Sequence, residues 1–174
     1  MALTAGLLTA SPAAAASSCA NADAAPGTIS AKAMSKATLC LLNEERADAG
    51  LKPLKSHKKL AKAARGFSKI MVKQQFFDHV SPSGSTLSSR VQKVKYTKGA
   101  HRWSLGENIA WGTGDQATPA SIVDAWMHSP GHKRNILDSS FTEIGIGIAA
   151  GAPLATAAAK SSGLTYTTDF GFRQ

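Results

Sequence analysis

The chain of 174 residues is 43% hydrophobic and carries a formal net charge of +9. This length suits one domain, and this apolar content is enough to form a buried core. After the N-terminal segment no apolar run is long enough to cross a bilayer, which excludes a transmembrane protein. We therefore expect one basic, soluble domain that is monomeric.

The N-terminus has the composition of an export signal. Residues 2–10 are apolar, and Ala14-Ala15-Ala16 offers an A-x-A cleavage site. The first basic residue is Lys32, so the usual basic start is missing, and the segment is either trimmed or begins upstream. Export predicts an extracellular location. We divide the chain into a signal peptide (1–18), an irregular tail (19–32) and a folded domain (33–174).

Export also gives meaning to the two cysteines, Cys19 and Cys40. In an oxidising compartment they predict one disulfide, which would join the tail to the first helix. The closed loop is short, so the entropic gain is about 3 kcal/mol. A catalytic Cys-His pair is one alternative, but a tail of small residues is a poor place for a nucleophile. Lipidation of Cys19 is another, but Ala16-Ser17-Ser18 lacks the leucine that such sites usually carry.

Cap and breaker residues predict the helices of the first half. The first helix runs from near Ser35 to Ala49 and is ended by Gly50. We expect its Asn43 and Arg46 to satisfy buried backbone groups and charge. Ser56 is a suitable N-cap for a second helix. The second helix ends near Gln75. A loop over Phe76–Ser85 and a short helix over Thr86–Lys93 follow it.

The second helix is basic along one face. Its cations fall at helical spacing: Lys58, Lys62, Arg65, Lys69 and Lys73. The opposite face is apolar: Leu60, Ala63, Ala64, Phe67, Ile70 and Met71. A solvated helix face is the simplest interpretation, and the functional alternative is attraction to anionic wall polymers or lipid headgroups. Nucleic acid is disfavoured because no aromatic residues interleave with the cations and the protein is exported.

Strand and cap signals follow one another in the second half. They first predict a strand over Trp103–Trp111 and two helices, opened by Thr118-Pro119 and by Ser129-Pro130. A strand over 144–149 follows, then an Ala/Gly/Ser-rich connection over 151–162 and a last strand over Gly163–Phe172. Along 144–149 isoleucines alternate with small residues, where another element can approach closely. Helices flanking a few late strands make an α+β pattern. We expect Trp111 and Trp126 in the core.

Six segments stand in a recognisable order. They are 41–46 with 50–54, Phe77–Pro82, Gly106–Ala110, Ala125–His132, Ile144–Gly147 and Tyr166–Gly171. Together they resemble the CAP superfamily (cysteine-rich secretory proteins, antigen 5 and plant pathogenesis-related proteins), and most closely its short secreted bacterial branch. The resemblance implies a three-layer α-β-α sandwich with a small antiparallel sheet. It also implies lipid or sterol binding as one role found in parts of the family.

The resemblance further implies a groove lined by two histidines and two acids. His79, Glu107 and His132 match three of those positions, and Ser129 stands where the fourth acid would fall. Two imidazoles and one carboxylate can hold Zn²⁺ or another divalent cation, with water in the open position. His128 is expected to be exposed. The structural alternatives are that His79 bonds a loop backbone and that Glu107 only pairs with His132.

Three functions remain open. The first is a secreted binding module for a divalent cation or a small or lipidic ligand. The second is a metal-assisted hydrolase of peptides or cell-wall material, with Glu107 as general base. The third is an interaction protein with a vestigial groove. The missing acid at Ser129 counts against catalysis, but the sequence leaves open whether the protein is an enzyme. No G-x-S-x-G, H-E-x-x-H or P-loop motif supports another enzyme class.

Overall fold

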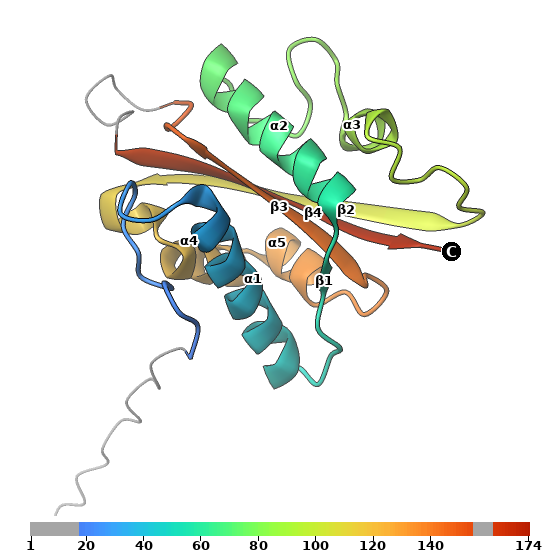
Figure 1. Ribbon diagram of the computed structural model, residues 1–174, viewed down its shortest axis with the longest axis horizontal. Coiled ribbons are helices and arrows are strands. Elements are labelled where there is room, and N and C mark those ends of the chain that lie inside the picture. Colours follow the sequence, from blue (N-terminus) through green and yellow to red (C-terminus); the bar gives the residue numbers. More distant parts are fainter. Residues whose placement is uncertain (1–17, 155–161) are drawn as a thin grey trace, which may run out of the picture.

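Figure 1 shows the computed structural model of the chain, which describes residues 18–154 and 162–174. The predicted signal peptide lies outside the described residues except for Ser18, and so does most of the predicted connection over 151–162. Within the described part of the chain, no helix combines the length and apolar character that a membrane span requires.

A four-stranded sheet forms the centre of the described structure. Its strands are β1 (Lys55–Ser56), β2 (Trp103–Thr113), β3 (Glu143–Ala150) and β4 (Gly163–Arg173). The order is β1-β3-β4-β2, so β2 forms one edge. β4 is antiparallel to both β2 and β3, whereas β1 is parallel to β3. The three long strands confirm the prediction, and the unpredicted β1 makes the sheet mixed.

Helices cover both faces of this sheet (Figure 1). On one face lie α2 (Lys58–Gln74) and α3 (Leu87–Lys93), and on the other lie α1 (Ala31–Asp48), α4 (Pro119–Met127) and α5 (Pro130–Ile136). A short 3-10 helix, η1 (Gly114–Ala117), connects β2 to α4. The predicted three-layer α-β-α sandwich is therefore confirmed.

The alternation along β3 explains how tightly the layers pack. Ile144, Ile146 and Ile148 join the core cluster that contains residues of α1 and α4. The intervening glycines face α2, where a Cβ on Gly147 would collide with the backbone nitrogen of Arg65. Only residues without a side chain allow α2 to lie this close to the sheet. The expected close approach of another element is thus confirmed.

Three predictions about α1 and α2 were wrong. α1 begins earlier than Ser35, at Ala31, because the Ser30 hydroxyl caps it by accepting a hydrogen bond from the amide of Ala33. Ser56 is not a helix cap, because it belongs to β1, and His57 caps α2 instead by accepting from the amide of Lys59. Ile70 does not join the buried face of α2, since 37% of it is exposed.

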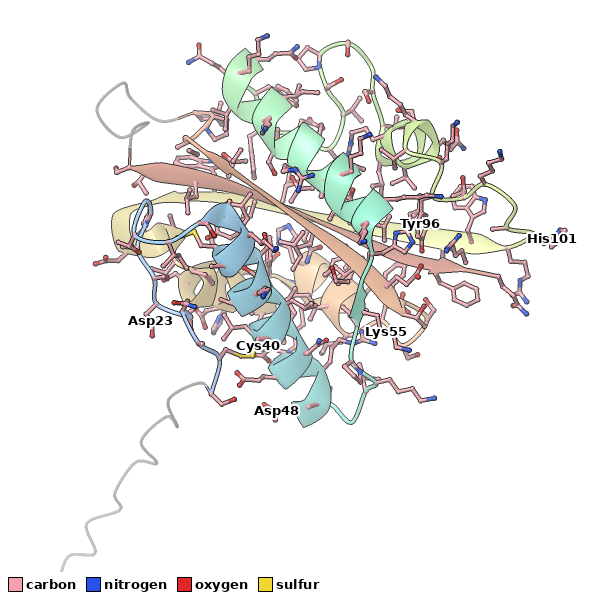
Figure 2. The ribbon with its side chains drawn as sticks, viewed as in Figure 1. Asp23, Cys40, Asp48, Lys55, Tyr96 and His101 are labelled. Atoms are coloured by element: carbon pink, nitrogen blue, oxygen red, sulfur yellow. A yellow bond between two sulfur atoms is a disulfide. The ribbon has the colours of Figure 1, made fainter. Side chains whose placement is uncertain are left out.

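The N-terminal tail is attached to the core rather than loose. The predicted disulfide between Cys19 and Cys40 is present, and Figure 2 labels Cys40 beside the yellow sulfur bond. Cys19 and Ala22 are both buried and pack in the main core cluster. The tail therefore forms part of the folded domain, and Cys19 carries no free thiol for catalysis or lipidation.

Buried polar groups on α1 behave as predicted. The Asn43 side chain donates to the carbonyl of Leu54 and accepts from its amide. The Arg46 guanidinium is buried and donates to main-chain carbonyls, including those of Ile136 and Phe141. These bonds tie α1 to the loops around α5 and β3. Of the two tryptophans expected in the core, Trp126 lies there and donates its indole N–H to the carbonyl of Ile109, whereas Trp111 on β2 is only half-buried.

Candidate functional site at the edge of β2

The segment Gly106-Glu107-Asn108 lies on the edge strand β2, where successive side chains point to opposite faces. A Cβ on Gly106 would lie 2.9 Å from the ring of Phe141, so glycine allows that ring to pack against the strand. Glu107 faces the layer of α2 and α3. Asn108 faces α5, where its amide donates to the carbonyl of His132.

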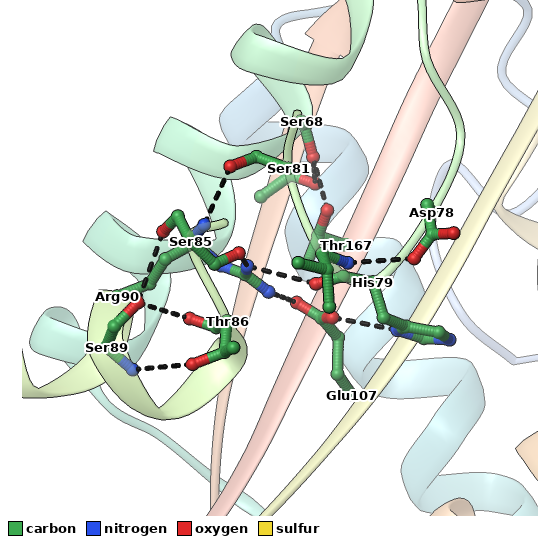
Figure 3. Close-up of polar contacts among 12 residues, drawn as sticks. Ser68, Asp78, His79, Ser81, Ser85, Thr86, Ser89, Arg90, Glu107 and Thr167 are labelled. Atoms are coloured by element: carbon green, nitrogen blue, oxygen red, sulfur yellow. Dashed lines mark hydrogen bonds and ion pairs between the residues drawn. The ribbon is translucent and has the colours of Figure 1, made fainter. Parts of the chain in front are cut away.

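Both carboxylate oxygens of Glu107 are already engaged. Oε1 lies 2.8 Å from Nδ1 of His79, and Oε2 lies 2.5 Å from Nη2 of Arg90 (Figure 3). Only 3% of the Glu107 side chain is exposed, so these two partners replace the water that a carboxylate needs. Glu107 is therefore a held anion, which makes it a poor general base or metal ligand in this arrangement.

His79 lies in the loop that approaches the edge of β2 from the α2–α3 layer. Its side chain is 53% exposed, and its hydrogen bond to Glu107 raises the pKa of the imidazole, although partial burial opposes this shift. A proton on Nδ1 completes the bond to Glu107 and leaves Nε2 for other partners. The Arg90 guanidinium donates to the His79 carbonyl, which fixes the loop.

Arg90 is a site residue that sequence reasoning missed. Its Nη1 donates to the carbonyls of His79 and Ser85, its Nη2 holds Glu107, and its guanidinium carbon lies 3.4 Å from the centre of the Phe67 ring. Only 7% of its side chain is exposed. No local pattern distinguishes it, because an arginine in a short serine-rich helix is usually solvated.

Asp169 is the second residue that was missed. It faces Glu107 across the β2–β4 ladder and is completely buried. Burial first, and then the Glu107 charge, raise the pKa of Asp169 well above its ordinary value. Within the described residues neither carboxyl oxygen receives a donor, and a proton on Asp169 removes the charge that burial and Glu107 both oppose.

His132 comes from the opposite layer, in the first turn of α5. Its ring is half-buried beside Trp126, with ring centres 6.5 Å apart. Burial, together with the charge of His79, lowers the pKa of His132, so this imidazole is neutral at neutral pH. Its Nδ1 is buried and has no hydrogen-bond partner in the described part of the chain. No described residue therefore satisfies this nitrogen.

The two remaining predicted positions have different outcomes. His128 is exposed, as expected, and pairs with Asp124 one helical turn earlier. Ser129 is half-buried at the N-cap of α5, and its side chain makes no capping hydrogen bond. The structure thus brings His79 and Glu107 together and sets His132 close enough for the charge of His79 to lower the pKa of His132. It does not pair Glu107 with His132.

The three predicted metal ligands do not form a closed site. Among the described residues, the group of three whose ligand atoms lie within 4.8 Å of one another is Cys19, Cys40 and Glu44. Two of these are the sulfurs of the disulfide and cannot act as thiolate ligands. Any cation at the edge of β2 would rely on the two imidazoles and on water or ligand atoms.

Residues 39–159 match the model of the cysteine-rich secretory protein family, and the chain therefore belongs to this CAP family. YkwD of Bacillus subtilis (strain 168), an uncharacterized protein, is 43% identical over 123 residues. That match covers 71% of this chain and 44% of YkwD, so the chain spans less than half the length of this relative.

Two solved structures have the same fold. An outer surface protein from Borrelia burgdorferi gives a TM-score of 0.68 at 21% identity, covering 86% of this chain and 99% of that one. An extracellular protein containing a SCP domain, from Bacillus anthracis str. Ames, gives 0.60 at 28% identity, covering 83% of this chain and 44% of that one.

Proposed function

We propose that this protein is an exported binding module for an amphiphile with one apolar chain and one anionic end. The observation that carries this proposal is a cavity of about 580 Å³ between α1, α2 and β3, which we call the amphiphile cavity. Its volume lies within the range of small-molecule sites in proteins. This place differs from the edge of β2, where the sequence predicted the groove.

The cavity exists because β1 is too short to cover β3. β1 pairs with only Glu143 and Ile144, so the rest of β3 has no strand on that side. α1 and α2 flank this uncovered edge from the two faces of the sheet (Figure 1). Ile144, Ile146 and Ile148 line the cavity, together with apolar residues of both helices. Such a lining suits an acyl chain.

The charged residues around the amphiphile cavity are all cations. Lys32 and Lys36 come from α1 and Arg65 comes from α2, and no acid contributes to the lining. An anionic end would lie near these cations while the apolar chain lies on the isoleucines. The basic face predicted on α2 is exposed, and it adds attraction to anionic lipid headgroups or wall polymers.

Binding is better supported than hydrolysis. Glu107 would have to release Arg90 or His79 before it could accept a proton from water. Ser129 supplies no second carboxylate. The remaining alternative, an interaction protein without a ligand, predicts that the amphiphile cavity takes no amphiphile.

A divalent cation is a second candidate ligand, because the buried Nδ1 of the half-buried His132 has no hydrogen-bond partner within the described residues. His132 and His79 would hold the cation, and Glu107 would orient His79 through its Nδ1 as carboxylates commonly do behind histidine ligands. A zinc titration by calorimetry tests this function. We expect one saturable site at neutral pH that disappears in His79→Ala and in His132→Ala. Its affinity should weaken as the pH falls, because protons compete for His79, whose pKa is raised. Binding untouched by either change would contradict it.

A fluorescent fatty acid, cis-parinarate, tests the amphiphile. We expect saturable binding that falls by about tenfold or more in Ala61→Phe, which places a ring in the amphiphile cavity, and several-fold in Lys36→Glu. Lys69→Glu is the matched control, because Lys69 is exposed on α2 and does not line the cavity. Equal binding by the wild type and by a folded Ala61→Phe variant would refute the proposal.

A further inference from the structure

A second cavity, separate from the amphiphile cavity, lies between α2 and α3 and has a volume of about 330 Å³. The two cavities share none of their lining residues. The amphiphile cavity takes Ala61 and Arg65 from α2, whereas this one takes Lys62, Gly66 and Ile70 from a different side of the same helix. We call it the α2–α3 cavity.

The walls of the α2–α3 cavity are apolar. Phe67 lies at its base and is buried, and Val94 closes the side next to α3. Ile70 also lines it and is one of the few large apolar residues that the described structure leaves exposed. Gly66 also lines the cavity, and a Cβ at that position would meet no atom within 4 Å. An apolar ligand would cover Ile70, which the fold itself leaves uncovered.

The polar part of the lining is cationic. Lys62 on α2 and Lys93 on α3 are exposed, Arg90 is buried, and no acid contributes. The two terminal nitrogens of Arg90 donate hydrogen bonds to Glu107 and to main-chain carbonyls. Its Nε has no acceptor within the described residues. The guanidinium carbon also lies over the Phe67 ring, so positive charge and an aromatic surface meet at the cavity lining.

We propose that the α2–α3 cavity is a binding site for a small apolar anion: one ring system or a short acyl chain that carries a single carboxylate or sulfonate. The apolar body packs on Phe67, Ile70 and Val94, and the acidic group lies between Lys62 and Lys93. The volume decides the size class, because about 330 Å³ is close to the lower limit for small-molecule sites. A lipid with two chains does not fit.

This inference does not depend on the amphiphile cavity. It connects instead to the site at the edge of β2, because Arg90 lines the α2–α3 cavity and also holds Glu107 and the His79 carbonyl. A ligand in the α2–α3 cavity would therefore lie next to Arg90, the residue that holds Glu107 and His79 in the candidate functional site.

Naphthalene-2-sulfonate, an aromatic anion with one ring system, is the probe for the test. Fluorescence titration of the folded chain, with amide chemical shifts recorded in parallel, should give one saturable site whose shift changes centre on Gly66 and Val94. Gly66→Leu fills the cavity and removes a helix glycine, so it should keep the fold and weaken binding by about tenfold or more. The double variant Lys62→Glu/Lys93→Glu should weaken binding to a similar degree.

Two controls separate this site from other binding. Lys69→Glu/Lys73→Glu makes the same charge change on exposed residues of α2 outside the cavity, and it should leave the affinity within about twofold. Ala61→Phe blocks only the amphiphile cavity and should have no effect on the probe. Full affinity in a folded Gly66→Leu variant, or shift changes that centre on α1 and β3, would overturn the proposal. So would the absence of saturable binding.

Discussion

Replacing Arg90 by methionine removes the buried cation from the candidate site and keeps a long side chain. The change breaks the ion pair with Glu107, two hydrogen bonds to carbonyls and the contact with Phe67. Removing one partner of a buried pair costs about 3–5 kcal/mol, because the other charge remains buried. The side chains of Arg90 and Glu107 are 7% and 3% exposed, so solvent offers little compensation.

Urea unfolding measures this loss. With a slope of about 2 kcal/mol per molar urea, we expect the midpoint to fall by about 2 M. Arg134→Met is the matched control, since Arg134 is exposed on α5, and its effect should stay within about 0.5 kcal/mol. Adding Glu107→Gln to Arg90→Met removes the uncompensated charge and should recover part of the stability. A loss below about 1 kcal/mol in Arg90→Met, additive with that of Glu107→Gln, would refute the ion-pair argument.

Three further predictions use the same unfolding measurements. Because the pKa of Asp169 is raised in the fold, its contribution to the free energy of unfolding is fully present below about pH 4 and is lost as pH rises. The stability of Asp169→Asn relative to the wild type should therefore increase between pH 4 and pH 8. The same stability difference between variant and wild type at both pH values would contradict this. Gly147→Ala should cost about 2 kcal/mol or more because α2 blocks its Cβ, whereas Gly66→Ala in open space should stabilise by about 0.5–1 kcal/mol. Replacing Cys19 and Cys40 by serine should cost about 3 kcal/mol for a sequence separation of 21, and an unchanged urea midpoint would argue against the disulfide's role.

Only part of the candidate site could be predicted from the sequence. His79, Glu107 and His132 were found because each lies in a segment that resembles a family motif. Arg90 and Asp169 were not assigned to the site, although Arg90 holds the Glu107 carboxylate and Asp169 lies opposite Glu107 in the ladder. Their roles depend on long-range placement: Arg90 comes from a separate helix, and Asp169 reaches Glu107 only through the register of β4 against β2.

The sequence by itself determined the order and type of most elements. Thr118-Pro119 and Ser129-Pro130 predicted two helices, and the alternation around Ile146 predicted a strand, because caps and periodicity are local properties. Only the tertiary structure decided that β1 pairs with β3, that Glu107 is held by His79 and Arg90, and that two cavities flank α2. These features arise where segments distant in the chain meet, and the packing of whole layers, rather than any short pattern, brings such segments together.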